Sequence, residues 1–149
     1  MGITYDHDAK ANVTTWVWDG VVTTDEWADA VRAQIAEPFW PPRANLTDLT
    51  TADISGITTG DIAEVAGLYI DQASRISGVQ SAIVADRGFP QAQTFESIVS
   101  PYGQRVIVFT NVSAGCMWLG IDVSETLSTI RRLRDSLRAS HSCDLGAES

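Results

Sequence analysis

Short β-branched and apolar runs alternate along the chain with longer segments in which apolar residues recur every three or four positions. The longer segments have the spacing of one helix face. Two runs are continuously apolar, as is typical of strands buried on both faces of a sheet. The strand-like runs cover residues 3–5, 12–18, 44–50, 80–86 and 105–110. Their order with the helical segments predicts β-β-α-β-α-β-α-β-α.

Capping residues mark where the helices should begin and end. Thr24 is expected to cap a helix that Pro38 stops, and Gly78 is expected to end a helix over 61–77. Asn111 should cap a further helix that ends at Gly120. Helices of 10–15 residues between strands favour right-handed crossovers and parallel pairing. We therefore predict an α/β fold with a mostly parallel (β-α)n superhelical sheet and an edge hairpin formed by the first two strands.

A further amphipathic helix is predicted over residues 121–138, followed by a disordered tail over 139–149. Four arginines lie within eight positions, near the predicted carboxyl end of this helix, where positive charge is favourable. The helix could pack on its own domain, form a dimer contact or lie on an anionic membrane. The apolar spacing suits the first two alternatives. The arginines are Arg131, Arg132, Arg134 and Arg138.

Composition fits a single soluble domain of 149 residues, 44% of them hydrophobic. The net charge of −9 gives a surface that phosphates repel, so we expect no nucleic-acid partner. No apolar run reaches the roughly 18 residues that cross a bilayer. The amino-terminal residues lack the basic and apolar regions of a signal peptide. We expect a cytoplasmic protein without a membrane partner.

The residues usual in catalysis are sparse and scattered. His7 lies in a turn and His141 in the predicted tail, and neither has a partner in sequence that suggests a triad or a metal site. Cys116 lies in an apolar helical run and Cys143 in a polar segment, without metal-ligand spacing. The common nucleophile, zinc and phosphate-loop motifs are absent. We expect no catalytic residue, no metal, no cofactor and no enzymatic activity.

The tryptophans offer a candidate ligand or interface face. Trp16 and Trp18 lie two positions apart on a predicted edge strand, so their side chains share one face, opposite Val13 and Val17. They could floor a ligand pocket or a dimer contact, or cover the sheet beneath a helix. Trp40 stands among prolines in a stiff loop, where we expect it to be exposed as an interface anchor.

The segment after the third strand carries many hydroxyl groups. Ser55 could accept phosphate at a helix start, where backbone N–H groups stabilise negative charge. Alternatively, Ser55, Thr58 and Thr59 only cap the turn and the helix. Asp53 and Gly56 complete a candidate interaction loop over 53–60.

Several segments together resemble the STAS-like (anti-sigma-factor-antagonist-like) proteins, and in particular their stand-alone, uncharacterised bacterial branch. They are D-G-V-V-T-T-D-E-W from residue 19, L-T-D-L from 46, D-I-S-G from 53 and N-V-S-A-G-C-M-W-L from 111. The resemblance covers residues 3–120, which we take as the domain. It implies a regulatory or binding module without catalysis. In its regulated members a partner kinase phosphorylates a serine, which falls here at Ser55, although Ile54 replaces the first serine of their pair.

The leading hypothesis is therefore a non-catalytic module that binds a protein partner through the loop over 53–60, with Ser55 as a phosphate acceptor. The first alternative is a small-molecule-binding protein that uses the Trp16/Trp18 face. The second is a homodimeric structural protein whose interface is the helix over 121–138.

Overall fold

A single five-stranded sheet forms the centre of the protein. The computed structural model describes residues 2–147, with side chains described as far as residue 140. β1 pairs antiparallel with β2, and the remaining neighbours pair in parallel. The α/β class and the hairpin at one edge are confirmed. In spatial order the strands are β1 (Ile3–Asp8), β2 (Val13–Val21), β3 (Ala44–Asp53), β4 (Gln80–Val84) and β5 (Arg105–Phe109).

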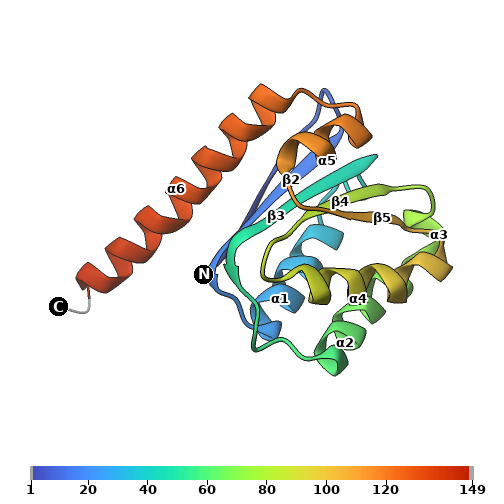
Figure 1. The fold of residues 1–149 in the computed structure, drawn as a ribbon, viewed down its shortest axis with the longest axis horizontal. Helices are drawn as coiled ribbons and strands as arrows, with labels where there is room; N and C mark the ends of the chain where they lie inside the picture. The colour runs from blue at the N-terminus through green and yellow to red at the C-terminus, as the bar shows by residue number, and fades with distance from the viewer. Residues whose placement is uncertain (1, 148–149) are drawn as a thin grey trace.

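Helices cover both faces of this sheet in a three-layer arrangement (Figure 1). Parallel strands that advance in one direction, joined by right-handed crossovers, place every connecting helix on the same face. The connecting helices α1, α2 and α4 lie on that face, whereas α5 and α6 lie on the other. The helices are α1 (Thr24–Ile35), α2 (Thr59–Ile70), α3 (Ala73–Ile76), α4 (Phe89–Val99), α5 (Val112–Leu119) and α6 (Val123–Ala147), with a 3-10 turn at Ser100–Tyr102.

The two faces of the sheet build two hydrophobic clusters. Along β2, Trp16 and Trp18 point into the cluster with α1, α2 and α4, while Val13 and Val17 point to α5 and α6. This alternation is the one that the sequence predicted, because successive side chains of a strand point to opposite faces. β2 is nevertheless not the edge strand that we expected, since β1 flanks it on that side.

Most helix ends follow local capping rules. Asn111 accepts a hydrogen bond from the N–H of Ala114 at 2.8 Å, as predicted for the start of α5. Gly120 ends α5 with φ of 69°, in the left-handed region that favours glycine. The cap of α1 is Thr23 and not Thr24, because Glu26 closes a reciprocal capping box with Thr23.

Other boundaries differ from the prediction. The first three strands run several residues further than expected, to Asp8, Val21 and Asp53. The helix predicted over 61–77 begins at Thr59 and is interrupted after Ile70, and Gln72 has φ of −108° and ψ of 19°, outside the helical region.

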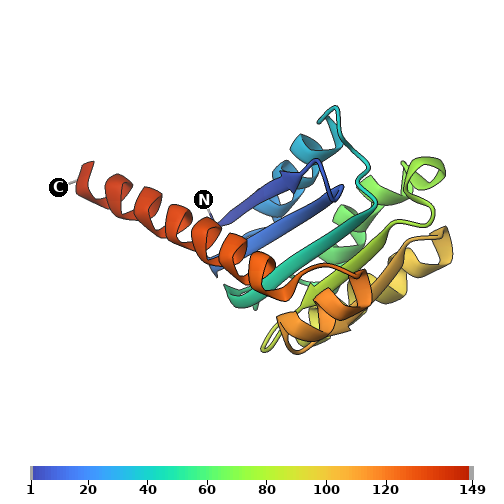
Figure 2. The same ribbon diagram turned by 90° about the horizontal axis from the view of Figure 1, so that it is seen from above.

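α6 differs most from its prediction. It continues to Ala147, whereas we expected the helix to end at residue 138 and a disordered tail to follow over 139–149. Proline is absent from 139–147 and glycine appears only at 146, so extending an existing helix is favourable. Ile130 and Leu133 join the cluster with β2 and β3, so this part of α6 packs on its own domain. The carboxyl end of α6 projects beyond the sheet (Figure 2).

Candidate ligand pocket and interaction loop

A pocket lies between the sheet and the helices α1, α2 and α4. The space open to the centre of a water molecule is about 80 Å³. One water needs about 10–15 Å³ by this measure, so the pocket holds several waters or a small organic group. It is lined by Trp16, Trp18, Trp27, Val31, Asn45, Thr47, Leu49, Ile54, Ile57, Ile62, Tyr69, Ser81, Ile83, Gln91, Ala92, Phe95 and Gln104.

An aromatic chain forms much of the pocket wall. Trp18 meets Trp27 edge-on, with ring centroids 5.5 Å apart, and Trp27 meets Phe95 in the same way at 5.8 Å. Tyr69 contacts Phe95 from the other side, also at 5.8 Å. Such edge-to-face pairs fix ring orientations and add to the stabilisation from burial. The predicted Trp16/Trp18 face is therefore covered by helices and faces this pocket.

Three buried polar atoms in the pocket wall have no hydrogen-bond partner in the described part of the protein. They are the indole Nε1 of Trp18 and the Oε1 atoms of Gln91 and Gln104. By contrast, the indole of Trp16 donates to Asn45 Oδ1 at 3.3 Å. Buried polar groups are almost always paired, because an unpaired one costs about 1–3 kcal/mol. Each of these atoms therefore needs a partner from water or from a polar ligand inside the pocket.

The pocket wall carries no charge. Among the residues that line it, none is Asp, Glu, Lys, Arg or His. Burial raises the pKa of the Tyr69 phenol, which therefore stays neutral at physiological pH. Away from the pocket, burial also raises the pKa of the Cys116 thiol, which disfavours the reactive thiolate.

Sequence reasoning found only part of this pocket. Trp16 and Trp18 were identified from their spacing, whereas Gln91 and Gln104 were not. Gln104 directly precedes β5, and its Nε2 donates to Ser81 Oγ at 3.3 Å. A glutamine directly before an apolar strand is the one signal in the sequence that points to Gln104.

Trp40 is not the exposed anchor that the prolines suggested. Its side chain is 4% exposed and packs with Ile76 and Val79. The guanidinium of Arg75 lies over its ring, 4.8 Å from the centroid, and donates to the Trp40 carbonyl at 3.1 Å. The stiff loop thus folds inward, because a cation and an apolar surface both stabilise the indole there.

The loop over 53–60 is built around a tight turn. Asp53 Oδ1 accepts hydrogen bonds from the Ser55 backbone at 3.0 Å and from its hydroxyl at 2.6 Å, and these bonds lower the pKa of Asp53. α2 begins only at Thr59, where Thr58 and Asp61 form a capping box. Ser55 therefore lies in the turn and not at the helix start that its predicted role as phosphate acceptor assumed. Ser55 and Gly56 are exposed.

This loop borders the pocket as well as solvent. Ile54 and Ile57 are buried and line the pocket, while Asp53, Ser55 and Gly56 line a shallow groove with residues 21–25. Val21, at the end of β2, forms an apolar rim of that groove and is 72% exposed. The loop over 53–60 and the Trp16/Trp18 face were predicted as separate sites. In the structure both form part of the wall of the same pocket.

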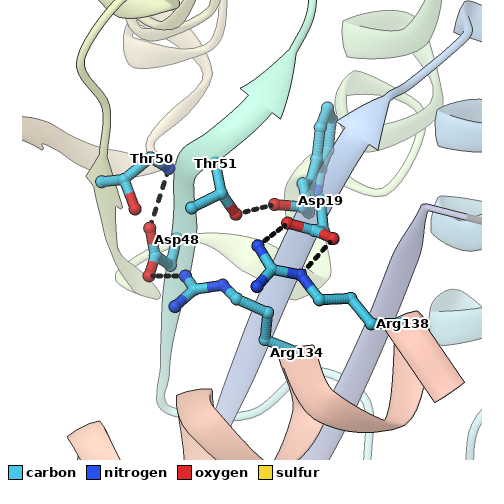
Figure 3. Close-up of polar contacts among 7 residues, drawn as sticks. Asp19, Asp48, Thr50, Thr51, Arg134 and Arg138 are labelled. Atoms are coloured by element: carbon cyan, nitrogen blue, oxygen red, sulfur yellow. Dashed lines mark hydrogen bonds and ion pairs between the residues drawn. The ribbon is translucent and has the colours of Figure 1, made fainter.

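The opposite face of the sheet carries ion pairs, and near the start of α6 it also has a second pocket, whose lining includes Asp6, Asp8, Asp122 and Glu125. Arg134 and Arg138 reach from α6 to Asp48 on β3 and Asp19 on β2 (Figure 3). Both nitrogens of the Arg138 fork lie 3.0 Å from the Asp19 oxygens, and this pairing lowers the pKa of Asp19. The arginines therefore attach α6 to the sheet, in place of the predicted interaction with the helix dipole.

Comparisons with known proteins add a fold neighbour. No family model matches the chain, and no curated protein matches it. The structure is similar to that of an uncharacterized protein from the DUF3478 family, with a SpoIIAA-like fold, from Shewanella loihica PV-4. The two chains are 14% identical, with 79% of this chain and 94% of that chain covered and a TM-score of 0.49.

Among the described residues, no helix is both long and apolar enough to span a membrane. No group of three or more His, Cys, Asp or Glu side chains in that part of the chain is arranged to hold a metal ion.

Proposed function

We propose that the protein is a non-catalytic binding protein that takes a small molecule into the pocket between the sheet and α1, α2 and α4. The unpartnered polar atoms of Trp18, Gln91 and Gln104 carry this proposal. A mainly apolar pocket with a few polar groups on its wall is the usual form of a small-molecule site. Absence of charge on the wall argues for binding and against acid–base chemistry.

Filling the pocket should abolish binding without unfolding the protein. Ala92 is buried in α4 and lines the pocket, so Ala92→Leu adds three carbons to the space that a ligand would occupy. Cavity filling commonly raises the free energy of unfolding by about 0.5–2 kcal/mol. We expect metabolites that raise the melting temperature of the wild type in a thermal-shift screen to leave Ala92→Leu unchanged.

Ala63→Leu provides the matched control, because Ala63 is exposed on α2. This variant should respond to ligands like the wild type. Equal responses of Ala92→Leu and the wild type would place binding elsewhere and contradict the proposal. A wild type that no compound in the screen stabilises would count against it as well.

A second candidate function is docking of a protein partner at the loop over 53–60, the leading hypothesis from the sequence. The exposed Val21 beside Ser55 and Gly56 supports it, since apolar groups at a rim of polar residues are common in interfaces. Because Ile54 and Ile57 line the pocket from the same loop, a bound ligand would touch the residues behind this surface. Phosphorylation of Ser55 and a homodimer through α6 stay predictions.

A bulky side chain in the loop should block such docking. A Cβ at Gly56 would meet no atom within 4 Å, so Gly56→Arg should keep the circular dichroism of the wild type. We expect it to lower recovery of a specific partner from cell lysate at least tenfold. Ser74→Arg, which adds the same charge at an exposed position on α3, should capture the partner normally. Undiminished capture by Gly56→Arg would exclude this surface.

A further inference from the structure

We propose that the protein forms a homodimer in which the β5 strands of two copies pair antiparallel, edge to edge, about a twofold axis at Ile107. The proposal rests on the free edge of β5 and not on the pocket, so it can fail without affecting the proposed function. The strand order places β5 at one end of the sheet and β1 at the other, so each has a neighbouring strand on one side only. The two edges differ in how they are protected.

The β1 edge is protected by charge and by covering side chains. Asp6 pairs with Arg132 of α6 at 3.0 Å, and the ring of His7 stacks on Phe39 with centroids 3.9 Å apart. Asp8 adds a further charge at the end of the strand. Charged side chains and covering elements are the usual means by which proteins keep edge strands from pairing with other chains. β1 is therefore a poor template for another strand.

The β5 edge lacks these protections within the strand itself. Every residue from Val106 to Phe109 is apolar, none is proline, and the register with β4 has no bulge. Ile107, in the middle of the strand, is 39% exposed. A regular, uncharged and apolar edge strand is a template for pairing with a further strand.

The backbone groups of β5 alternate between β4 and the free side. The N–H of Arg105 and the carbonyl of Phe109 bond to the backbone immediately before and after β4, at 3.1 and 3.0 Å. Because this direction alternates along a strand, Val106 and Val108 turn their N–H and C=O groups away from β4. These groups have no hydrogen-bond partner among the described residues. A second extended strand would satisfy them in register.

An antiparallel pairing of β5 with itself is self-complementary. When Ile107 lies opposite Ile107 of the other copy, Val106 of each copy exchanges both backbone hydrogen bonds with Val108 of the other. Ile107 points to the α5 face of the sheet, as Phe109 does, so the two exposed isoleucines pack on each other. Arg105 then lies opposite Phe109 of the other copy, where a guanidinium over an aromatic ring is favourable.

Charge and symmetry favour a second copy as the occupant of this edge. The chain has a net charge of −9, so two copies repel over most of their surface, whereas the single charge within β5 is the positive Arg105. Each copy has one such edge and pairing uses both, so assembly stops at the dimer. Met117 of α5 is 77% exposed and follows Cys116, next to Trp118, whose ring centroid lies 5.9 Å from that of Phe109. It extends the apolar surface beside the edge.

Sedimentation equilibrium of the full chain over a series of concentrations measures this association. The wild type should sediment with twice the mass of the chain. Ile107→Lys should raise the dissociation constant of the dimer at least tenfold, because it places like charges opposite each other. Leu127→Lys makes the same kind of change at a residue of α6 that is 43% exposed, and it should dimerise normally. A monomeric wild type, or an Ile107→Lys variant that dimerises as well as Leu127→Lys, would overturn the proposal.

Mixing two charge variants tests the register. Ile107→Lys and Ile107→Glu should each be monomeric with the circular dichroism of the wild type, because residue 107 is already partly in water. In an equal mixture they should form a heterodimer, since opposite charges then face each other across the twofold axis. The backbone amides of Val106 and Val108 should exchange with deuterium at least tenfold more slowly in the wild type than in either variant alone. No heterodimer, or equal exchange rates, would contradict the pairing of β5 with itself.

Discussion

Ending the chain after Gly120 is expected to unfold the protein, even though residues 1–120 contain all five strands. The reason is the strand order. Because the strands advance in one direction, the connecting helices all lie on one face of the sheet, and only α5 and α6 cover the other. Without α6, Val13 and Val17 on β2 would face water.

The expected loss of folding free energy is comparable to the whole stability of a domain. Ile130 and Leu133 are buried, and each such side chain contributes roughly 1.5–3 kcal/mol. The buried carboxylate of Asp48 would also lose Arg134, and breaking a buried pair costs about 3–5 kcal/mol. Whole domains are stable by only about 5–15 kcal/mol. Circular dichroism and the dispersion of NMR amide signals would detect the unfolding.

A second truncation separates the packed part of α6 from its projecting end. Ending the chain after residue 140 keeps Ile130, Leu133 and the three arginine–aspartate pairs to the sheet. This chain should unfold at nearly the same urea concentration as the full chain. A folded 1–120 chain with an unchanged melting temperature would contradict the account of α6 as part of the domain.

The order of elements followed from local pattern, because local physics determines it. Alternation in β2 placed Trp16 and Val17 on opposite faces, and the continuous apolar run of β4 indicated burial. The same expectation for β5 was wrong, because β5 is an edge strand and Ile107 is 39% exposed. Asn111 and Gly120 bounded α5 through hydrogen bonds and backbone preferences within a few residues. Boundaries that depend on tertiary pairing, such as the longer β3, were not predictable in this way.

Features made by distant residues were the ones that local pattern could not predict. The pocket joins Trp18, Gln91 and Gln104, which come from β2, α4 and the start of β5. Burial of Trp40 depends on Arg75, 35 positions away. The arginines of α6 resembled charges that complement a helix end, but they pair with aspartates 86 to 126 positions earlier in the chain. No periodicity encodes such pairs.

Replacing Arg134 by methionine should strongly destabilise the packing of α6 on the sheet. Asp48 is 3% exposed, and its two oxygens accept from Arg134 at 2.8 Å and from the Thr50 N–H at 2.8 Å (Figure 3). Arg134→Met leaves one buried carboxylate oxygen without a partner, so the free energy of unfolding should fall by about 3 kcal/mol. Urea unfolding measures this loss.

A double-mutant cycle tests whether the loss of stability in Arg134→Met comes from leaving the charge of Asp48 buried without a partner. Asp48→Asn keeps the oxygen that accepts from Thr50 but removes the charge, so adding it to Arg134→Met should restore about 2 kcal/mol. Arg131→Met, at an exposed position of α6, should change the free energy of unfolding by less than about 0.5 kcal/mol. Two results would contradict this account: equal losses of unfolding free energy from Arg131→Met and Arg134→Met, or no recovery of stability in the double variant. Either would mean that the composition of α6, and not its buried pair with Asp48, holds it on the sheet.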